Sequence, residues 1–411
     1  MSHSPQSWVT TLLHEVADFE MGQAPPGSTT NTDGNGTIFV KAGEFGPKYP
    51  IVREWTTKPL KFARHGDVLI CVVGATAGKL NLGIDCAIGR SVAAIRPRMS
   101  GLQSCIYYQL QQKVMSLRAD STGSAQGVIS KEMLSDIRVV VPPIEEQKRI
   151  ADKLDTVLTR IDAVNTRLAR VAPLLKRFRQ SVLAAATSGR LTEEWRLANG
   201  VSDPQALTLG ELIKVSSGDG LTAKEMKSAG GVPVYGGNGI NGHHDQSNVS
   251  APTIVIGRVG FYCGSVHLTS SIAWVTDNAL RVKFDPTKLD RKYLYFALQG
   301  TDLRQNMSST AQPVISGQKI YPLSFNLPTL PEQTEIVRRV ETLFSFADRL
   351  EARVQTAQTA ADRLTPSLLA KAFRGELVPQ DPNDEPASEL LKRLAAAPAT
   401  LTRKRRSKTT S

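Results

Sequence analysis

The chain has 411 residues, of which 41% are hydrophobic and 21% are charged, and this balance is that of a globular protein with room for two or three domains. It excludes a fibrous or wholly disordered chain, and no apolar run approaches the roughly 18 residues that a membrane span needs. The start "MSHSPQSWVTTLL" carries no signal-peptide pattern, so we expect a cytoplasmic protein. The net charge of +12 favours a polyanionic partner.

Residues 1–141 predict a first globular domain of mixed α/β type. The β-branched runs "DVLICVV" (67–73) and "SVAAI" (91–95) favour strands, and "SCIYYQLQQKV" (104–114) favours a helix. Glycine-rich loops separate these segments. Cysteines are scattered without a CxxC pair, so we expect small buried side chains rather than disulfides or a zinc site.

Residues 142–189 predict a long helix. Pro142 and Pro143 precede an acidic first turn, which suits the electropositive start of a helix. Gly189 stands where a left-handed residue would end it. From Ile150 onward, apolar residues recur at intervals of four and three, which is the heptad pattern of a coiled coil. Pro173 lies inside this pattern, so we expect a kink or local unwinding there.

Residues 190–327 predict a second α/β domain, with strands in "PTIVIG" (252–257) and "ALRVKF" (279–284) and a helix in "RKYLYFALQG" (291–300). A second long helix is expected over residues 328–378, with a kink or unwinding at Pro366. Beyond it, residues 379–411 predict a short helix and a basic disordered tail.

The second half of the chain repeats the first. A shift of 186 residues lays "AQPVIS" (311–316) on "AQGVIS" (125–130), and it aligns residues 328–377 with 142–191 without a gap. The same shift superposes the glycines of "VLICVVGATAG" (68–78) and "IVIGRVGFYCG" (254–264). Such a fixed offset marks a tandem duplication. Outside the shared glycines and strands the two domains diverge, so a common frame carries different loops.

Each long helix has an apolar seam that it cannot bury alone. The obvious partner is the other copy, and pairing about a pseudo-twofold axis perpendicular to the helices makes them antiparallel. The alternative is that each helix packs separately on its own domain. The expected seam consists of Ile150, Leu154, Val157, Ile161, Val164, Leu168, Val171, Leu175 and Phe178, and of Ile336, Val340, Leu343, Leu350, Val354, Leu364 and Leu368.

No enzyme motif is complete. Residues 74–79 resemble a phosphate-binding loop, but three residues separate the glycines where four are needed, and Leu80 replaces the required hydroxyl residue. The sequence has neither a tetrad that holds a flipped adenine nor a methyl-donor fingerprint. His243 and His244 lack converging ligands, so we expect exposed loop histidines rather than a metal site. We therefore expect no catalytic residue, no metal and no cofactor in this chain.

The loops offer polar groups that suit DNA. Asparagine amides form paired hydrogen bonds with adenine, and arginine guanidinium groups form bidentate hydrogen bonds with guanine. Residues shared by both copies suit phosphate contacts or packing better, because a side chain that is the same in both domains cannot distinguish two different base sequences. The candidates are Lys41, Arg53, Arg64, Thr76, Arg90, Ser124, Gln126, Asn238, Asn241, His243, Arg258, Tyr262, Thr310 and Gln312.

The order of these segments resembles the specificity subunit of type I restriction-modification systems. The resemblance rests on the "P-x-x-EQ" helix that ends in "SGRL", the second "LPEQ" helix that ends in "FRGELVPQDP", and the run "VPVYGGNGINGHHD" in the second domain. It covers residues 5–390. The first domain departs most, with little match between residues 23 and 60.

The resemblance implies two target recognition domains, each reading one half of a split DNA sequence. It also implies helices that act as a ruler and dock two methyltransferase (modification) subunits, and restriction subunits that translocate and cut. S-adenosylmethionine, ATP and Mg are then expected in those partners only. The rival interpretations are a coiled-coil scaffold with two protein-binding heads, the specificity domain of a related methyltransferase-nuclease system, and a methyltransferase fragment.

Overall fold

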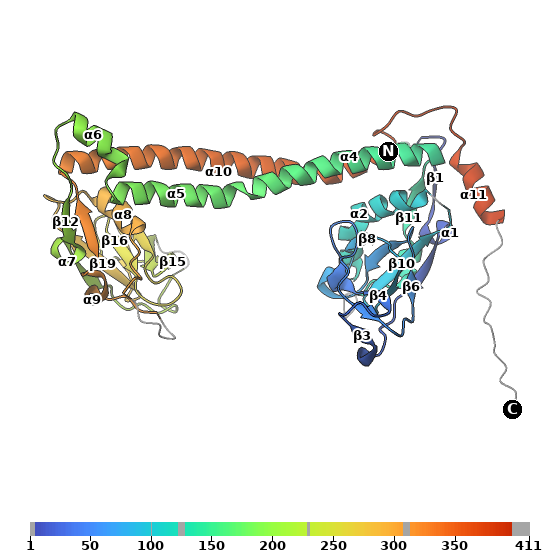
Figure 1. Ribbon diagram of the computed structural model, residues 1–411, viewed down its shortest axis with the longest axis horizontal. Helices are drawn as coiled ribbons and strands as arrows, with labels where there is room; N and C mark the ends of the chain where they lie inside the picture. Colours follow the sequence, from blue (N-terminus) through green and yellow to red (C-terminus); the bar gives the residue numbers. More distant parts are fainter. Residues whose placement is uncertain (1–4, 100, 122–127, 228–230, 307–312, 397–411) are drawn as a thin grey trace. The chain divides into compact units, whose positions relative to one another are not determined.

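The computed structural model describes residues 5–99, 101–121, 128–227, 231–306 and 313–396 (Figure 1). The chain forms two compact units. Unit 1 contains residues 1–166 and 358–411, and unit 2 contains residues 167–357. The boundary therefore does not follow the sequence repeat, because each unit takes part of both long helices.

Unit 1 is an α/β domain with three sheets. A four-stranded antiparallel sheet has the order β2-β10-β7-β8, a mixed sheet has the order β3-β5-β4-β9-β6, and β1 pairs with β11. Helix α2 packs against the four-stranded sheet. The strands are β1 (Val9–Leu12), β2 (Ala17–Met21), β3 (Thr30–Asn31), β4 (Thr37–Val40), β5 (Trp55–Thr56), β6 (Phe62–Ala63), β7 (Val68–Cys71), β8 (Leu80–Leu82), β9 (Cys86–Ile88), β10 (Val92–Pro97) and β11 (Arg138–Val141). The helices are α1 (Leu13–Val16), α2 (Leu102–Ser121), α3 (Lys131–Ser135), α4 (Ile144–Ala169, which crosses into unit 2) and α11 (Ala387–Ala396).

Unit 2 repeats this frame with a smaller second sheet. Its four-stranded antiparallel sheet has the order β13-β19-β16-β17, a three-stranded sheet has the order β15-β14-β18, and β12 pairs with β20. The strands are β12 (Gln205–Thr208), β13 (Ile213–Ser217), β14 (Val232–Gly236), β15 (Gly239–His244), β16 (Ile254–Gly257), β17 (Val266–Leu268), β18 (Trp274–Val275), β19 (Ala279–Phe284) and β20 (Ser324–Leu327). The helices are α5 (Val171–Thr187), α6 (Glu193–Ala198), α7 (Leu209–Leu212), α8 (Arg291–Gly300), α9 (Gly317–Ile320) and α10 (Leu330–Ala372, which ends in unit 1).

The matched sheets confirm the duplication. The strands predicted from "DVLICVV" and "PTIVIG" are β7 and β16, and they occupy the same position in the two four-stranded sheets. The side chains of β7 alternate between the two faces of the four-stranded sheet. Val68 and Ile70 join the large core under α2, whereas Leu69 and Cys71 join the core of the five-stranded sheet. The segment between the first and third strands of this frame spans residues 22–67 in unit 1 and the shorter 218–253 in unit 2. The two domains therefore differ mainly in this insert.

In unit 1 the start of α4 lies against the end of α10. Ile150 and Leu154 share one core with Leu369 and Ala372. Farther along, the Nε2 of Gln358 donates to the Oδ1 of Asn165 at 3.3 Å. Residues later in α4 therefore contact residues earlier in α10, so the two helices are antiparallel, as predicted.

In unit 2 the end of α5 lies against the start of α10. Val182 and Ala186 share a core with Ile336 and Val340, and the guanidinium of Arg179 pairs with the carboxylates of Asp348 at 2.6 Å and Glu351 at 2.8 Å. This pair is antiparallel too. The helices therefore pair as predicted and also pack on the cores of their domains, so the alternative of separate packing without pairing is wrong.

The expected seam is wrong at two positions. Val164 is 46% exposed and Leu364 is 52% exposed. An α-helix has 3.6 residues per turn, whereas apolar residues at intervals of four and three repeat every 3.5 residues. The apolar stripe that they form therefore shifts around the helix by about 20° per heptad. Asn165 rather than Val164 consequently makes the contact with α10. In the second helix the small side chains of Ala347 and Ala361 are buried.

The two prolines behave differently. The first long helix breaks at Arg170, between α4 and α5, which places Pro173 in the first turn of α5. A proline in a first turn removes no helical hydrogen bond. Helix α10 runs through Pro366 without interruption, so the unwinding expected there is absent. Gly189 and Gly375 have φ angles of 77° and 80°, which confirms the left-handed helix ends.

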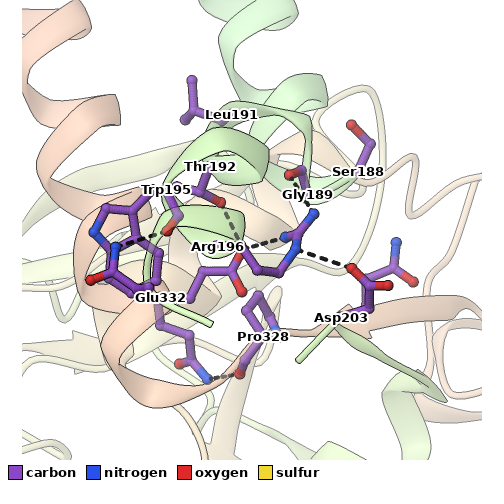
Figure 2. Close-up of polar contacts among 12 residues, drawn as sticks. Ser188, Gly189, Leu191, Thr192, Trp195, Arg196, Asp203, Pro328 and Glu332 are labelled. Carbon is purple, nitrogen blue, oxygen red and sulfur yellow. Dashed lines mark hydrogen bonds and ion pairs between the residues drawn. The ribbon is translucent and has the colours of Figure 1, made fainter. Parts of the chain in front are cut away.

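A buried glutamate stands in the first turn of both α4 and α10, and Figure 2 shows the one in unit 2. Glu332 accepts hydrogen bonds from the hydroxyl of Thr192 at 2.7 Å and from the guanidinium of Arg196, which also pairs with Asp203 at 3.1 Å. The next residue, Gln333, donates to the carbonyl of Pro328 at 2.9 Å. The segment after α5 therefore fastens the start of α10.

The equivalent glutamate in unit 1 has different partners. Glu146 accepts from the indole Nε1 of Trp8 at 2.7 Å and from the amide of Gln380. Gln147 donates to the carbonyl of Pro142 at 2.7 Å, as Gln333 does in unit 2 to its own proline carbonyl. Here the segment after α10 fastens the start of α4. The repeated "EQ" is thus a structural element of the helix starts.

Candidate DNA interface

In unit 2 the loop between β16 and β17 is built around glycines. Gly260 and Gly264 have φ angles of 76° and 86°, a conformation that other residues rarely adopt. The amide of Gly264 donates to the carbonyl of Gly257 at 2.8 Å, and that of Cys263 donates to the carbonyl of Gly260 at 3.0 Å. These bonds close a short loop that leaves Tyr262 47% exposed.

The hairpin between β14 and β15 lies directly against this loop. A Cβ on Gly257 would stand only 2.5 Å from the carbonyl oxygens of Gly237 and Tyr262, so the close approach requires glycine there. Asn238 sits exposed at the turn of the hairpin. Arg258 directs its Nη1 toward the hydroxyl of Ser217 at 3.2 Å and the main-chain carbonyl of Asp277 at 3.4 Å. Three candidates, Asn238, Arg258 and Tyr262, are therefore brought together.

Two further candidates of unit 2, Asn241 and His243, lie along β15. Asn241 is exposed, and its amide stands against Gly236. His243 is exposed as expected, but the expectation for His244 is wrong. His244 is buried at the end of β15, where its ring packs edge-on to Trp274 at 5.3 Å between centroids. Alternation along the strand turns the two neighbouring histidines to opposite faces.

The corresponding loop of unit 1 has the same backbone. Gly74 and Gly78 have φ angles of 73° and 84°, and the amide of Gly78 donates to the carbonyl of Cys71 at 2.7 Å. Ala75 and Thr76 are exposed at its tip. The sequence resemblance to a phosphate-binding loop ends here, because the Nζ of Lys79 donates to the carbonyl of Phe45 at 2.6 Å.

A cavity of about 480 Å³ lies beside this loop and brings further candidates together. Lys41, Arg90 and Val73 line it. Lys41 pairs with Glu54 at 2.6 Å, so its charge is largely compensated, whereas Arg90 is exposed. Arg90 is therefore the stronger candidate for contact with an anion.

Two further arginine candidates, Arg53 and Arg64, do not line this cavity. Arg53 is exposed and precedes Glu54 in the chain. Arg64 is exposed before β7, at the end of that strand opposite to the Gly74 loop. The structure does not bring Arg64 together with Arg90 and Thr76, so its role stays a prediction.

The repeated loops that contain Ser124, Gln126, Thr310 and Gln312 lie outside the described residues. Their described neighbours do pair with the glycine loops. Val128 forms a bridge with Val73, and Val314 forms the equivalent bridge with Val259. The frame around the glycine loops is thus the same in both units.

Sequence reasoning missed the charged surroundings of the unit 2 loop. The Nη2 of Arg304 donates to the carbonyl of Phe261 at 2.9 Å, and its Nε donates to that of Cys263. Burial raises the pKa of the Cys263 thiol, while the positive charges of Arg304 and Lys319 act in the opposite direction. Both cations come from segments far along the chain, and no local pattern indicates their place.

The described part of the chain contains no group of three or more histidine, cysteine or acidic residues that could hold a metal ion. Among these same residues, no helix is long and apolar enough to cross a membrane.

Two copies of one sheet frame that carry different loops define a duplicated recognition protein. The sequence matches the family described as type I restriction modification DNA specificity domain at residues 5–172 and 202–357. It is 34% identical over 346 residues to the type I restriction enzyme StySPI specificity subunit of Salmonella potsdam, over 75% of this chain and 73% of that protein. The EcoKI specificity subunit of Escherichia coli K12 is 32% identical over 348 residues, with the same two coverages.

Two solved structures have a similar fold. A chain from a structural study of complex assembly in the type I R-M system has a TM-score of 0.73 at 18% identity, over 91% of this chain and all of that one. The HsdS subunit from Thermoanaerobacter tengcongensis has a TM-score of 0.57 at 18% identity, over 91% and 98%. The chain belongs to the type I restriction-modification DNA specificity family. It is a DNA specificity subunit, and catalysis lies in partner subunits.

Proposed function

We propose that each unit reads one half of an asymmetric, two-part DNA target, and that the paired helices set the distance between the halves. The observation that carries this proposal is the matched pair of sheets with unlike loops. One frame presents Ala75 and Thr76 where the other presents Phe261 and Tyr262. Unlike loops on like frames suit unlike sequences.

The candidate residues divide by role. Asn238 and Arg258 offer the donor and acceptor patterns that read adenine and guanine in the major groove. Arg90 offers a charge for the backbone or a base in the first half-target. We assign target recognition domains to residues 1–141 and 190–327, spacer helices to 142–189 and 328–378, and a short helix with a basic tail to 379–411.

The helices are also the proposed docking surface for two methyltransferase subunits, with restriction subunits joining the complex in the cytoplasm. Support comes from apolar side chains that the helix pairs leave open, such as Leu174 at 58% exposed and Phe346 at 51% exposed. The methyl donor, ATP and Mg then bind to those partners.

The test is to express the chain with its modification subunit in a host that lacks DNA methylation, and to map methylated adenines across the genome. We expect one motif with two unlike specified halves and a fixed gap. Replacing residues 190–327 by the corresponding domain of another specificity subunit should change only one half of the motif. A continuous motif, or changes in both halves after the exchange, would contradict the proposal.

A further inference from the structure

Phe261 is 83% exposed at the tip of the loop between β16 and β17. Its ring packs edge-on against that of Tyr262, with 5.1 Å between centroids. Exposing so large an apolar side chain forgoes the stabilisation that burial would give. The neighbouring Tyr262 supports one side of the ring and leaves the rest open.

The loop holds Phe261 in a fixed position. Its carbonyl accepts from Arg304, and Cys263, two residues on, is buried in the core of unit 2. The amide of Gly260 donates to the carbonyl of Pro313 at 3.0 Å, and that of Ser265 donates to the carbonyl of Tyr262 at 3.0 Å. A tip fixed on both sides loses little conformational entropy when it inserts into a partner.

The unit 1 loop shows that the aromatic pair is not needed to form this backbone. Residue 75 is alanine and residue 76 is threonine, yet the hydrogen bonds recur. The amide of Ala77 donates to the carbonyl of Gly74 at 2.9 Å, as Cys263 does to Gly260 at 3.0 Å. Phe261 and Tyr262 therefore have a role other than folding of the loop.

The surroundings of the tip favour a polyanion. Among the described residues, Arg258 and Arg304 form no ion pair with a carboxylate. Their guanidinium groups instead bind main-chain carbonyls and a hydroxyl. Each positive charge thus remains available to a phosphate. Asn238 is exposed on the adjoining hairpin, and its amide is of a type that can pair with a base edge.

We infer that Phe261 inserts between bases of the half-target that unit 2 reads, and that it unstacks a base step there while Arg258 and Arg304 contact the flanking phosphates. Phenylalanine is one of the apolar side chains that proteins use as such a wedge. This inference rests on the proposed function. Because unit 1 has Ala75 at the equivalent tip, the equivalent step of its half-target stays stacked.

The experiment uses the chain assembled with its modification subunits and duplexes that carry the mapped target. 2-Aminopurine, whose fluorescence rises when it is unstacked, replaces one base at a time in each half. The methylated adenine is left out because methyltransferases flip their target base. We expect a several-fold rise at one step of the unit 2 half. Phe261→Ala should abolish that rise and weaken binding by about ten- to a hundredfold, and Phe261→Trp should restore both.

Leu197→Ala is the matched control, because Leu197 is 78% exposed on α6 and lies outside the proposed interface. It should change neither readout. Failure of the wild-type complex to bind the mapped target would refute the proposed function itself. If the wild type binds but Phe261→Ala binds equally well and gives the same fluorescence, the wedge is refuted while the proposed function stands. Loss of assembly with the modification subunits in Phe261→Ala would also refute the wedge, since the ring would then be a protein contact.

Discussion

Glu146 and Glu332 occupy the same position in the repeat but have chemically different partners. Glu332 is fully buried against the guanidinium of Arg196, whose side chain is only 10% exposed. Glu146 instead accepts from two neutral donors, Trp8 and Gln380. Removing the charge of Glu332 leaves Arg196 with only the exposed carboxylate of Asp203 as an ionic partner. Trp8 and Gln380 are neutral, so removing the charge of Glu146 weakens their hydrogen bonds but leaves no unpaired charge.

We therefore predict that Glu332→Gln lowers the free energy of unfolding by roughly 3 kcal/mol, and that Glu146→Gln lowers it by about 1 kcal/mol. Urea unfolding of the two variants and the wild type at neutral pH measures both values. Equal costs in the two variants would show that Arg196 contributes no more than a neutral donor.

Glu146 also predicts a pH dependence. Burial raises the pKa of its carboxyl above the ordinary value, and the hydrogen bonds from Trp8 and Gln380 oppose this only in part; Arg149 also lowers the pKa and Asp384 raises it. The folded state then holds the proton more tightly than the unfolded state. Stability from this group is present below the ordinary pKa and is lost as the pH rises through the raised one.

Glu146→Gln does not titrate, so the stability advantage of the wild type over this variant should shrink as the pH rises from the ordinary carboxyl pKa through the raised one. Urea unfolding of both proteins across that range gives the difference directly. An advantage that grows with pH would mean that the native pKa is lowered instead.

The sequence predicted the repeated glutamates but not their partners. Glu146 and Glu332 align at the fixed offset, and so do Gln147 and Gln333. Arg196 aligns with Pro382 and Gln380 aligns with Glu194, so the residues that hold the carboxylates do not repeat. Only the fold brings them into contact. The same holds for Arg304, which reaches its loop from a distant segment.

At the scale of elements, the strands and the glycine loops were predictable because they depend on local rules. Continuous apolar runs predicted the strands β7 and β16. The paired glycines predicted the two loops, and these glycines adopt positive φ angles. The helix seam was predictable only in part, because a heptad pattern does not show which of the apolar residues the partner helix buries. Leu154 is fully buried, but Val164 is 46% exposed and Leu168 is half-buried.

The seam supplies a matched pair of variants. Leu154→Ala removes a fully buried side chain, and we predict a cost of about 2–5 kcal/mol. Val164→Ala, from the same expected seam, should cost less than about 0.5 kcal/mol. If Leu168 were fully buried in the seam, Leu168→Asp would bury an unpaired carboxylate and cost several kcal/mol. Because Leu168 is only half-buried, we expect a cost between those of the other two variants. Thermal unfolding of the three variants orders these costs, and a large effect at Val164 would contradict the observed exposure.

At the scale of the whole molecule, the two units differ from the two sequence copies. The first copy ends near residue 189, but unit 1 ends at residue 166 and resumes at residue 358. Antiparallel pairing explains the difference, because it places the end of each long helix on the start of the other. Each unit is therefore completed by a segment from the other copy: residues 167–189 of the first copy belong to unit 2, and residues 358–378 of the second copy belong to unit 1.

The proposed spacer makes a prediction about the target DNA. Asn165 and Gln358 contact each other across the helix pair in unit 1, so a heptad inserted after Asn165 and another before Gln358 keep the two seams opposite. Seven residues add about 10 Å of helix, which corresponds to about three base pairs at 3.4 Å each. Genome-wide methylation mapping should then return the same two half-targets with a gap longer by about three base pairs. A heptad inserted in only one helix shifts its seam against an unchanged partner, so this control should lose methylation. If the doubly lengthened protein still methylates the original motif with its original gap, the helices do not set the spacing.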